Sequence, residues 1–169
     1  GFYDVSASTR ANNAFMIEMA RYEFDKYKNA DNFAGCFAGI RAGLDHKYHG
    51  IYNMERQLLQ DDIINQIFTN KHKESLCQSH PYIIFNAGCF FSGKLALIDF
   101  LIREQYLPSL EKFVRINSNF IRIEFPEWPF YLDNNPATAV DLTDREAGYL
   151  CEIACEAALL QRKNIIYEH

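Results

Sequence analysis

Apolar residues in the first half of the chain recur at helical spacing in two separate stretches. The first stretch contains Ala11, Phe15, Met19 and Tyr22. The second is built on Leu59, Ile63 and Ile67, with further apolar residues beside them. A spacing of three or four residues places such side chains on one face of a helix. The pattern therefore predicts two amphipathic helices, and we interpret residues 1–80 as a helical N-terminal extension.

Residues 31–50, between these helices, contain four glycines and predict loops or a close contact between helices. His46 and His49 in this segment are spaced so that they can share a helical face. A metal site would need acidic or cysteine partners to complete a tetrahedral set, and none is suitably placed. We therefore favour surface or internally hydrogen-bonded histidines and expect no metal site.

The pattern changes after Pro81, where short apolar runs alternate with segments of helical periodicity. The runs predict strands near residues 82–85, 113–116 and 165–167. A helix is expected over "KLALIDFLIREQ", residues 94–105, and a second helix is expected to begin at the capping box of Thr143 and Glu146. Strands that alternate with helices favour a parallel sheet. The predicted fold of residues 81–169 is therefore an α/β fold, a parallel sheet flanked by helices.

Composition and charge exclude several classes of partner. The net charge is −5 and the chain has no run of Lys or Arg, so nothing favours binding to nucleic acid. No apolar stretch reaches the roughly 20 residues of a transmembrane segment. Five cysteines without a C-x-x-C pair are typical of reduced thiols in an intracellular compartment. The chain opens on Gly1, so the choice between cytoplasm and an organelle such as the mitochondrion stays open.

The loop after the first predicted strand has most of a phosphate-binding motif. Gly88, Gly93 and Lys94 stand at the places of G-x-x-x-x-G-K-[ST], but Leu95 replaces the final Ser or Thr. Ligands of parallel α/β sheets bind beyond the carboxyl ends of the strands. We therefore expect this loop, Asn117 to Asn119, and Glu168 to lie at one edge of the sheet.

Three segments then resemble the zeta toxin family of P-loop kinases. They are "NAGCFFSGKL", "FVRINSNFIRIEFPEWPFY" and "LTDREAGYLCEIACEAALLQRKNIIYEH", and "YNMERQLLQDDII" resembles the helix that precedes the domain in the eukaryotic branch. The resemblance implies a P-loop kinase-like fold. It also implies transfer of the γ-phosphate of ATP or GTP, with magnesium, to a hydroxyl of UDP-N-acetylglucosamine or a related sugar nucleotide. The family domain continues beyond the residue that His169 matches, so we expect residues 81–169 to be a partial domain.

The same resemblance assigns roles to individual residues. Lys94 matches the lysine that reaches the β- and γ-phosphates, and Leu95 matches the hydroxyl residue that binds magnesium. A hydrocarbon side chain has no lone pair for a metal ion. Asn119 matches the catalytic aspartate, with Asn117 at the first position of its D-x-D pair. An amide cannot take a proton from the attacking hydroxyl, so we expect Asn119 to be inactive as a base.

Two acidic residues match the acceptor-binding positions of the family. Glu152 and Glu168 would accept hydrogen bonds from sugar hydroxyl groups. Inside the loop, Phe90 and Phe91 stand where the family has small residues, and two phenyl rings there are expected to narrow the phosphate pocket.

Three functional hypotheses follow. We favour a non-catalytic descendant of the kinase fold, which serves as a structural or accessory subunit among other protein subunits and needs no cofactor. The second hypothesis is a working kinase of UDP-N-acetylglucosamine or a related sugar nucleotide, which uses ATP or GTP with magnesium. The third is a module that binds a nucleotide or UDP-sugar without turnover through Lys94, Glu152 and Glu168.

Overall fold

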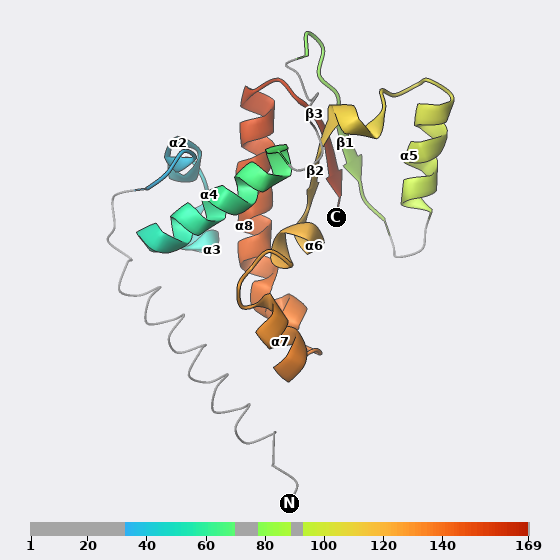
Figure 1. Ribbon diagram of the computed structural model, residues 1–169. Helices are drawn as coiled ribbons and strands as arrows, with labels where there is room; N and C mark the ends of the chain where they lie inside the picture. The colour runs from blue at the N-terminus through green and yellow to red at the C-terminus, as the bar shows by residue number, and fades with distance from the viewer. Residues whose placement is uncertain (1–32, 70–77, 89–92, 169) are drawn as a thin grey trace, which may run out of the picture.

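The computed structural model describes residues 33–69, 78–88 and 93–168 (Figure 1). The predicted helix around residues 11–22 lies outside this part. The second predicted helix is confirmed as α4 (Met54–Thr69). The glycine-containing segment before it forms two short helices, α2 (Ala38–Ala42) and α3 (His46–His49), and both contact α8. The expected close contact between helices is therefore present.

The α/β part begins after Pro81. Its elements are β1 (Ile83–Asn86), α5 (Lys94–Arg103), η1 (Leu110–Lys112), β2 (Phe113–Asn117), α6 (Ser118–Arg122), α7 (Trp128–Asn134), α8 (Ala139–Leu160) and β3 (Asn164–Glu168). Each predicted strand is confirmed to within one residue at either end. None of the helices in the described ranges is long and apolar enough to span a bilayer.

The three strands of the described residues form one parallel sheet in the order β1-β3-β2. Ile83 of β1 lies opposite Ile165 of β3, which in turn lies opposite Val114 of β2. The carboxyl ends of all three strands consequently reach the same edge of the sheet, as the sequence predicted for a ligand-binding edge.

Helices cover both faces of this sheet (Figure 1). On one face, Val114 and Ile116 of β2 and Ile165 of β3 pack with apolar residues of α8 and α4. On the other face, Ile166 of β3 packs with Ile98 of α5. The fold is therefore the predicted P-loop kinase-like α/β fold, with helical segments before it.

The helix α8 begins earlier than predicted, so the capping-box interpretation is wrong. The helix begins at Ala139, and Thr143 lies inside it with its Oγ1 donating to the carbonyl oxygen of Ala139 at 3.0 Å. A threonine hydroxyl inside a helix can be satisfied in this way by the preceding turn. Glu146 is engaged by α4 instead of the helix start.

The helices before Pro81 share a core with the sheet. Ile63 and Ile64 of α4 are buried in the same cluster as Val114 and Leu150. The division of the chain between residues 80 and 81 stays a prediction.

Candidate functional site

The loop between β1 and α5 is shaped by two glycines with positive φ. Gly88 has φ 152° and Gly93 has φ 81°, and Gly93 directly precedes α5. Residues with a Cβ rarely adopt these angles. Lys94 is the first residue of α5, and its Nζ donates to the carbonyl oxygen of Gly88. The structure therefore brings Gly88 and Lys94 together; residues 89–92, including Phe90 and Phe91, and the side chain of Leu95 lie outside the described part.

A row of polar residues crosses the carboxyl edge of the sheet. Asn86, Glu168 and Asn117 occupy one rung across β1, β3 and β2. Glu168 is only 7% exposed. Both of its carboxylate oxygens accept from Nη2 of Arg115, at 3.0 and 3.1 Å, and Oε2 also accepts from Nδ2 of Asn117 at 3.2 Å. These three hydrogen bonds satisfy the polar oxygens of the buried Glu168 side chain.

Asn119 is held at the same edge by two contacts. Its backbone N–H donates to Oδ1 of Asn117 at 2.8 Å, which caps the start of α6. Its side-chain Oδ1 accepts from Nη1 of Arg122 at 3.0 Å. Arg122 is buried and also donates from Nη2 to Asp144 of α8 at 2.9 Å. The edge is thus lined by amides whose orientation is set by neighbouring donors.

Glu152 lies on α8 and contacts a different element. Its Oε2 lies 3.1 Å from Nε2 of His49, a buried residue of α3. The ring of His49 also lies against Tyr149, with 4.9 Å between the ring centroids. Glu152 and Glu168 therefore have separate partners: Glu152 pairs with His49, and Glu168 pairs with Arg115.

The sequence analysis did not identify Arg115 and Arg122 as part of this edge. One signal was present in the run "FVRIN", where the charged Arg115 stands between the apolar residues Val114 and Ile116. A charge in such a strand requires a partner, because burial of an unpaired ion is costly. The identity of that partner depends on the neighbouring strand and could not be read from the local sequence.

The residues at this edge do not fit a magnesium ion. Leu95 supplies no oxygen at the position expected to bind the metal, and the oxygens of Glu168 already accept from Arg115. In the part of the chain that the structure describes, no three His, Cys, Asp or Glu side chains are grouped to hold a metal ion. Phosphate binding by Gly88, Gly93 and Lys94 stays a prediction.

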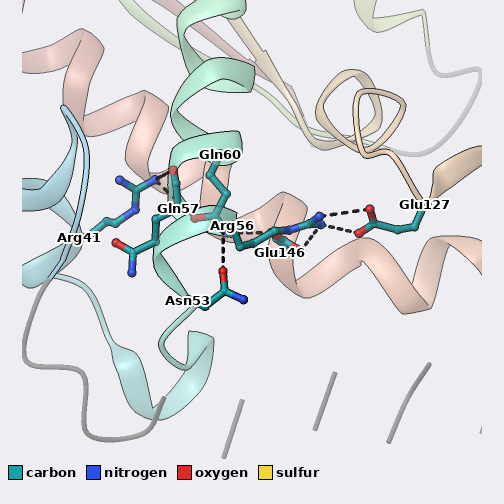
Figure 2. A network of polar contacts seen from close by, with 7 residues as sticks. All are labelled: Arg41, Asn53, Arg56, Gln57, Gln60, Glu127 and Glu146. Carbon is teal, nitrogen blue, oxygen red and sulfur yellow. Dashed lines mark hydrogen bonds and ion pairs between the residues drawn. The ribbon is translucent and has the colours of Figure 1, made fainter. Parts of the chain in front are cut away.

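A second polar network joins α4 to α8 and to the segment before α7 (Figure 2). Arg56 of α4 donates to Glu146 of α8 and to Glu127, which precedes α7. Gln60 of α4 also donates to Glu146, at 2.7 Å. Burial lowers the pKa of Arg56, but the hydrogen bonds and charges of the two carboxylates outweigh this effect and raise it. The guanidinium therefore stays charged inside the junction.

Comparison with known families identifies the α/β part. The model of the family described as Zeta toxin matches residues 65–169. The chain belongs to the zeta toxin family. The zeta toxin match begins near the end of α4 and includes all three strands, the loop before α5 and the polar row.

A solved structure has a similar fold. It comes from work on the PezAT chromosomal toxin–antitoxin system of the human pathogen Streptococcus pneumoniae, and it matches with a TM-score of 0.56 and 16% identity. The match covers 72% of this chain and 48% of that chain, so the present chain spans about half the length of its structural relative. Identity at this level shows the fold alone. A comparison with curated proteins gave no match.

Proposed function

We propose that this chain is a zeta-toxin-like P-loop kinase unit that does not transfer phosphate and serves as an accessory subunit of a larger assembly. The observation that carries the proposal is the state of Asn119. The resemblance to the family matches Asn119 to the catalytic base, and its Oδ1 accepts a hydrogen bond from the buried Arg122. An amide held in this way has no basic group to deprotonate an attacking hydroxyl.

The residues expected to bind magnesium support the same proposal. Phosphoryl transfer depends on a magnesium ion that neutralises charge on the β- and γ-phosphates. Leu95 has no oxygen for that ion, and Asn117 donates its amide hydrogen to Glu168. The base and the metal site are therefore both altered, and repair of either one alone should not restore transfer.

A transfer assay tests this proposal. The chain is incubated with ATP or GTP, MgCl2 and UDP-N-acetylglucosamine, and phosphorylated sugar is followed by phosphorus NMR beside an active zeta toxin kinase as positive control. We expect no product from this chain. Formation of more than one equivalent of phosphorylated sugar per chain would establish a working kinase and overturn the proposal.

The accessory role is supported by apolar side chains that remain on the surface of the α/β part. Ile83 and Phe85 of β1 and the preceding Tyr82 are exposed, although strands of parallel sheets are normally covered. We propose that other protein subunits cover these surfaces. We also propose that residues 1–80 form a helical extension and that residues 81–169 form a partial kinase-like domain. The stretch at residues 52–64 supports assignment to the eukaryotic branch, and the free thiol of Cys151 is consistent with a reducing compartment.

A second candidate function is binding of a nucleotide without turnover. It is favoured by the positive φ angles of Gly88 and Gly93 and by the position of Lys94 at the start of α5. To bind a UDP-sugar, Glu152 would have to release His49 and Glu168 would have to release Arg115. A calorimetric titration with ATP separates this candidate from a purely structural role, because a structural subunit would give no binding heat.

A further inference from the structure

The ring of His46, the first residue of α3, contacts two backbone carbonyl groups. Its Nδ1 lies 3.0 Å from the carbonyl oxygen of Gly50, and its Nε2 lies 2.7 Å from the carbonyl oxygen of Arg41. A carbonyl oxygen only accepts, so each contact is a hydrogen bond only if the ring nitrogen donates. A neutral imidazole has one N–H, whereas an imidazolium has two. Hydrogen bonds to both carbonyl groups therefore require the protonated ring.

Two further features around His46 favour a positive charge. The ring of Phe33 is stacked on the His46 ring, with 4.7 Å between the ring centroids. The face of an aromatic ring attracts positive charge. The carbonyl group of Arg41 belongs to the last turn of α2, where a helix carries partial negative charge. A neutral His46 ring would instead direct a nitrogen lone pair at one of the two carbonyl oxygens.

The two contacts of His46 serve different parts of the structure. The contact with Gly50 closes α3 on itself, because Gly50 follows the last residue of α3 and donates its own backbone N–H to the carbonyl oxygen of His46. The contact with Arg41 joins α3 to the end of α2. Gly50 is buried, and a buried carbonyl group that loses its donor destabilises the fold. A neutral ring therefore gives up either the end of α3 or its attachment to α2.

α3 also holds a second histidine against α8 (Figure 1). His49 is buried, and its Nε2 lies 3.1 Å from Oε2 of Glu152. Its ring packs against Tyr149, and Arg145 lies over the ring of the neighbouring Tyr48. An α3 that opens would consequently take His49 away from Glu152.

The charged and titratable groups around His46 come from α3 and from the elements that pack on it. They are Asp45, Lys47, Tyr48 and His49 on and beside α3, Arg41 of α2, Asp61 of α4, and Arg145, Tyr149 and Glu152 of α8. Arg41 and Asp61 pair with each other at 2.6 Å, and burial raises the pKa of Tyr149 to about 12. Histidine is the side chain that ordinarily changes charge between about pH 5 and pH 8. A change of pH in this range therefore acts on α3 through His46 and His49.

We propose that α3 is a pH-sensitive latch, which is closed on α2 and α8 while His46 carries both ring protons and opens when one proton is lost to solvent. A histidine in water is mostly neutral above about pH 6.5, so above this pH the closed form binds more protons than the open form. Closure is therefore favoured at acidic pH and weakens as the pH rises. The latch needs no nucleotide or sugar, so it does not depend on the proposed function.

Hydrogen exchange of the whole chain, recorded by NMR at about pH 6 and about pH 8, tests the latch. The amides of Tyr48, His49 and Gly50 report on α3, because their N–H groups donate to the carbonyl oxygens of Asp45 and His46. After correction for the intrinsic pH dependence of exchange, their protection should fall at least about tenfold between the two pH values. Amides inside α8 are the internal reference and should change by less than about twofold.

Substitutions assign the pH dependence to one histidine. His46→Gln removes the titrating ring and should leave α3 weakly protected at both pH values. His49→Gln keeps a side-chain N–H for Glu152 and should retain the pH dependence. His80→Gln is the matched control, because His80 is an exposed histidine outside α3, and it should behave as the wild type. The latch is wrong if the wild-type chain protects α3 equally at both pH values, or if the pH dependence persists in His46→Gln.

Nitrogen-15 spectra of the wild-type histidine rings cover the case in which His46→Gln fails to fold. These spectra distinguish a ring with two protonated nitrogens from either neutral tautomer. At about pH 7, both ring nitrogens of His46 should carry protons, whereas the exposed His80 should be mostly neutral. A single protonated nitrogen on His46 at this pH would mean that one of the two carbonyl contacts is not a hydrogen bond, and would overturn the proposal.

Discussion

Arg56 and Glu146, which lie 90 residues apart in the sequence, form a two-pronged ion pair. Nε of Arg56 donates to Oε1 of Glu146 at 2.6 Å, and Nη2 donates to Oε2 at 2.7 Å. Both side chains are largely removed from water. The pair fastens α4 to the middle of α8 and makes the helices before the sheet part of the same packed unit.

Removal of one partner of this pair should destabilise the protein strongly. Glu146→Ala leaves the partly buried guanidinium of Arg56 with Glu127 as its remaining carboxylate, and loss of hydrogen bonds to a charged partner costs about 2 kcal/mol. Urea denaturation monitored by circular dichroism measures the free energy of unfolding. The control is Glu156→Ala, an exposed glutamate on the same helix, which should change it by less than about 0.5 kcal/mol. Equal effects of the two variants would contradict the role of the pair.

A fragment of residues 81–169 should not fold as an independent unit. It lacks Ile63 and Ile64, which are buried against the sheet and α8, and it leaves Glu127 and Glu146 without Arg56. We expect a broad thermal transition without cooperativity, recorded by circular dichroism. A fragment of residues 33–169 is the control and should melt cooperatively, because it keeps α2 to α4. A sharp transition of fragment 81–169 would show that the α/β part is self-sufficient.

Much of the fold was predictable because apolar periodicity reports burial directly. The runs around Ile84, Val114 and Ile166 gave the strands, and the spacing of Leu59, Ile63 and Ile67 gave α4. The start of α8 was not predictable in the same way. Thr143 and Glu146 fit a local capping motif, but a partner on α4 and the preceding turn decided their contacts.

The candidate site was also predictable only in part. Topology was enough to place Asn117, Asn119 and Glu168 at one edge, since the carboxyl ends of parallel strands meet there. The partners of Glu168 and Glu152 were not accessible from sequence. Arg115 pairs across strands and His49 pairs across helices, and contacts of this kind exist only after the elements have packed.

The stability of the protein should fall at alkaline pH partly through Cys151. Burial raises the pKa of this thiol from 9.0 to about 12. The unfolded chain releases the proton above about pH 9 while the folded chain keeps it, so the stabilisation is present below that pH and is lost as the pH rises toward 12. The loss amounts to about 1.4 kcal/mol per pH unit in this range.

Cys151→Ala should remove this part of the pH dependence. Between about pH 8 and pH 10.5 the variant should lose about 2 kcal/mol less unfolding free energy than the wild type, measured by urea denaturation at each pH. Tyr106→Phe, at an exposed tyrosine, is the control and should follow the wild type. Identical losses in wild type and Cys151→Ala would show that the thiol ionises equally in both states.

Repair of a single motif position should not restore phosphoryl transfer. Leu95→Ser supplies a hydroxyl for the metal but leaves the amide of Asn119, the residue that we propose to match the family's base. Asn119→Asp places a carboxylate against Nη1 of Arg122, which should keep or raise stability by up to about 1 kcal/mol through a charge-assisted hydrogen bond. Phosphorus NMR should detect no phosphorylated UDP-N-acetylglucosamine with either variant. Product from one of them would mean that a single residue separates this chain from an active kinase.

The outer strand β1 bears the exposed apolar surface on which the assembly proposal depends. Its neighbour β3 is buried along almost its whole length, whereas Phe85 of β1 is 69% exposed. The described part of the chain provides no strand on the other side of β1. An uncovered apolar outer strand is a ready surface for pairing with another chain.

The isolated chain should therefore associate in solution. Size-exclusion chromatography with light scattering should give a mass above the 19.7 kDa of one chain, and Phe85→Lys should lower it toward that value, because a charge on an outer strand opposes pairing. Met54→Lys is the control, since Met54 is also exposed but lies at the start of α4, away from β1. If the wild-type chain and both variants elute as stable monomers, the exposed strand does not drive assembly. A decrease in mass for Phe85→Lys alone would assign the contact to β1, because the two variants add the same charge at different surfaces.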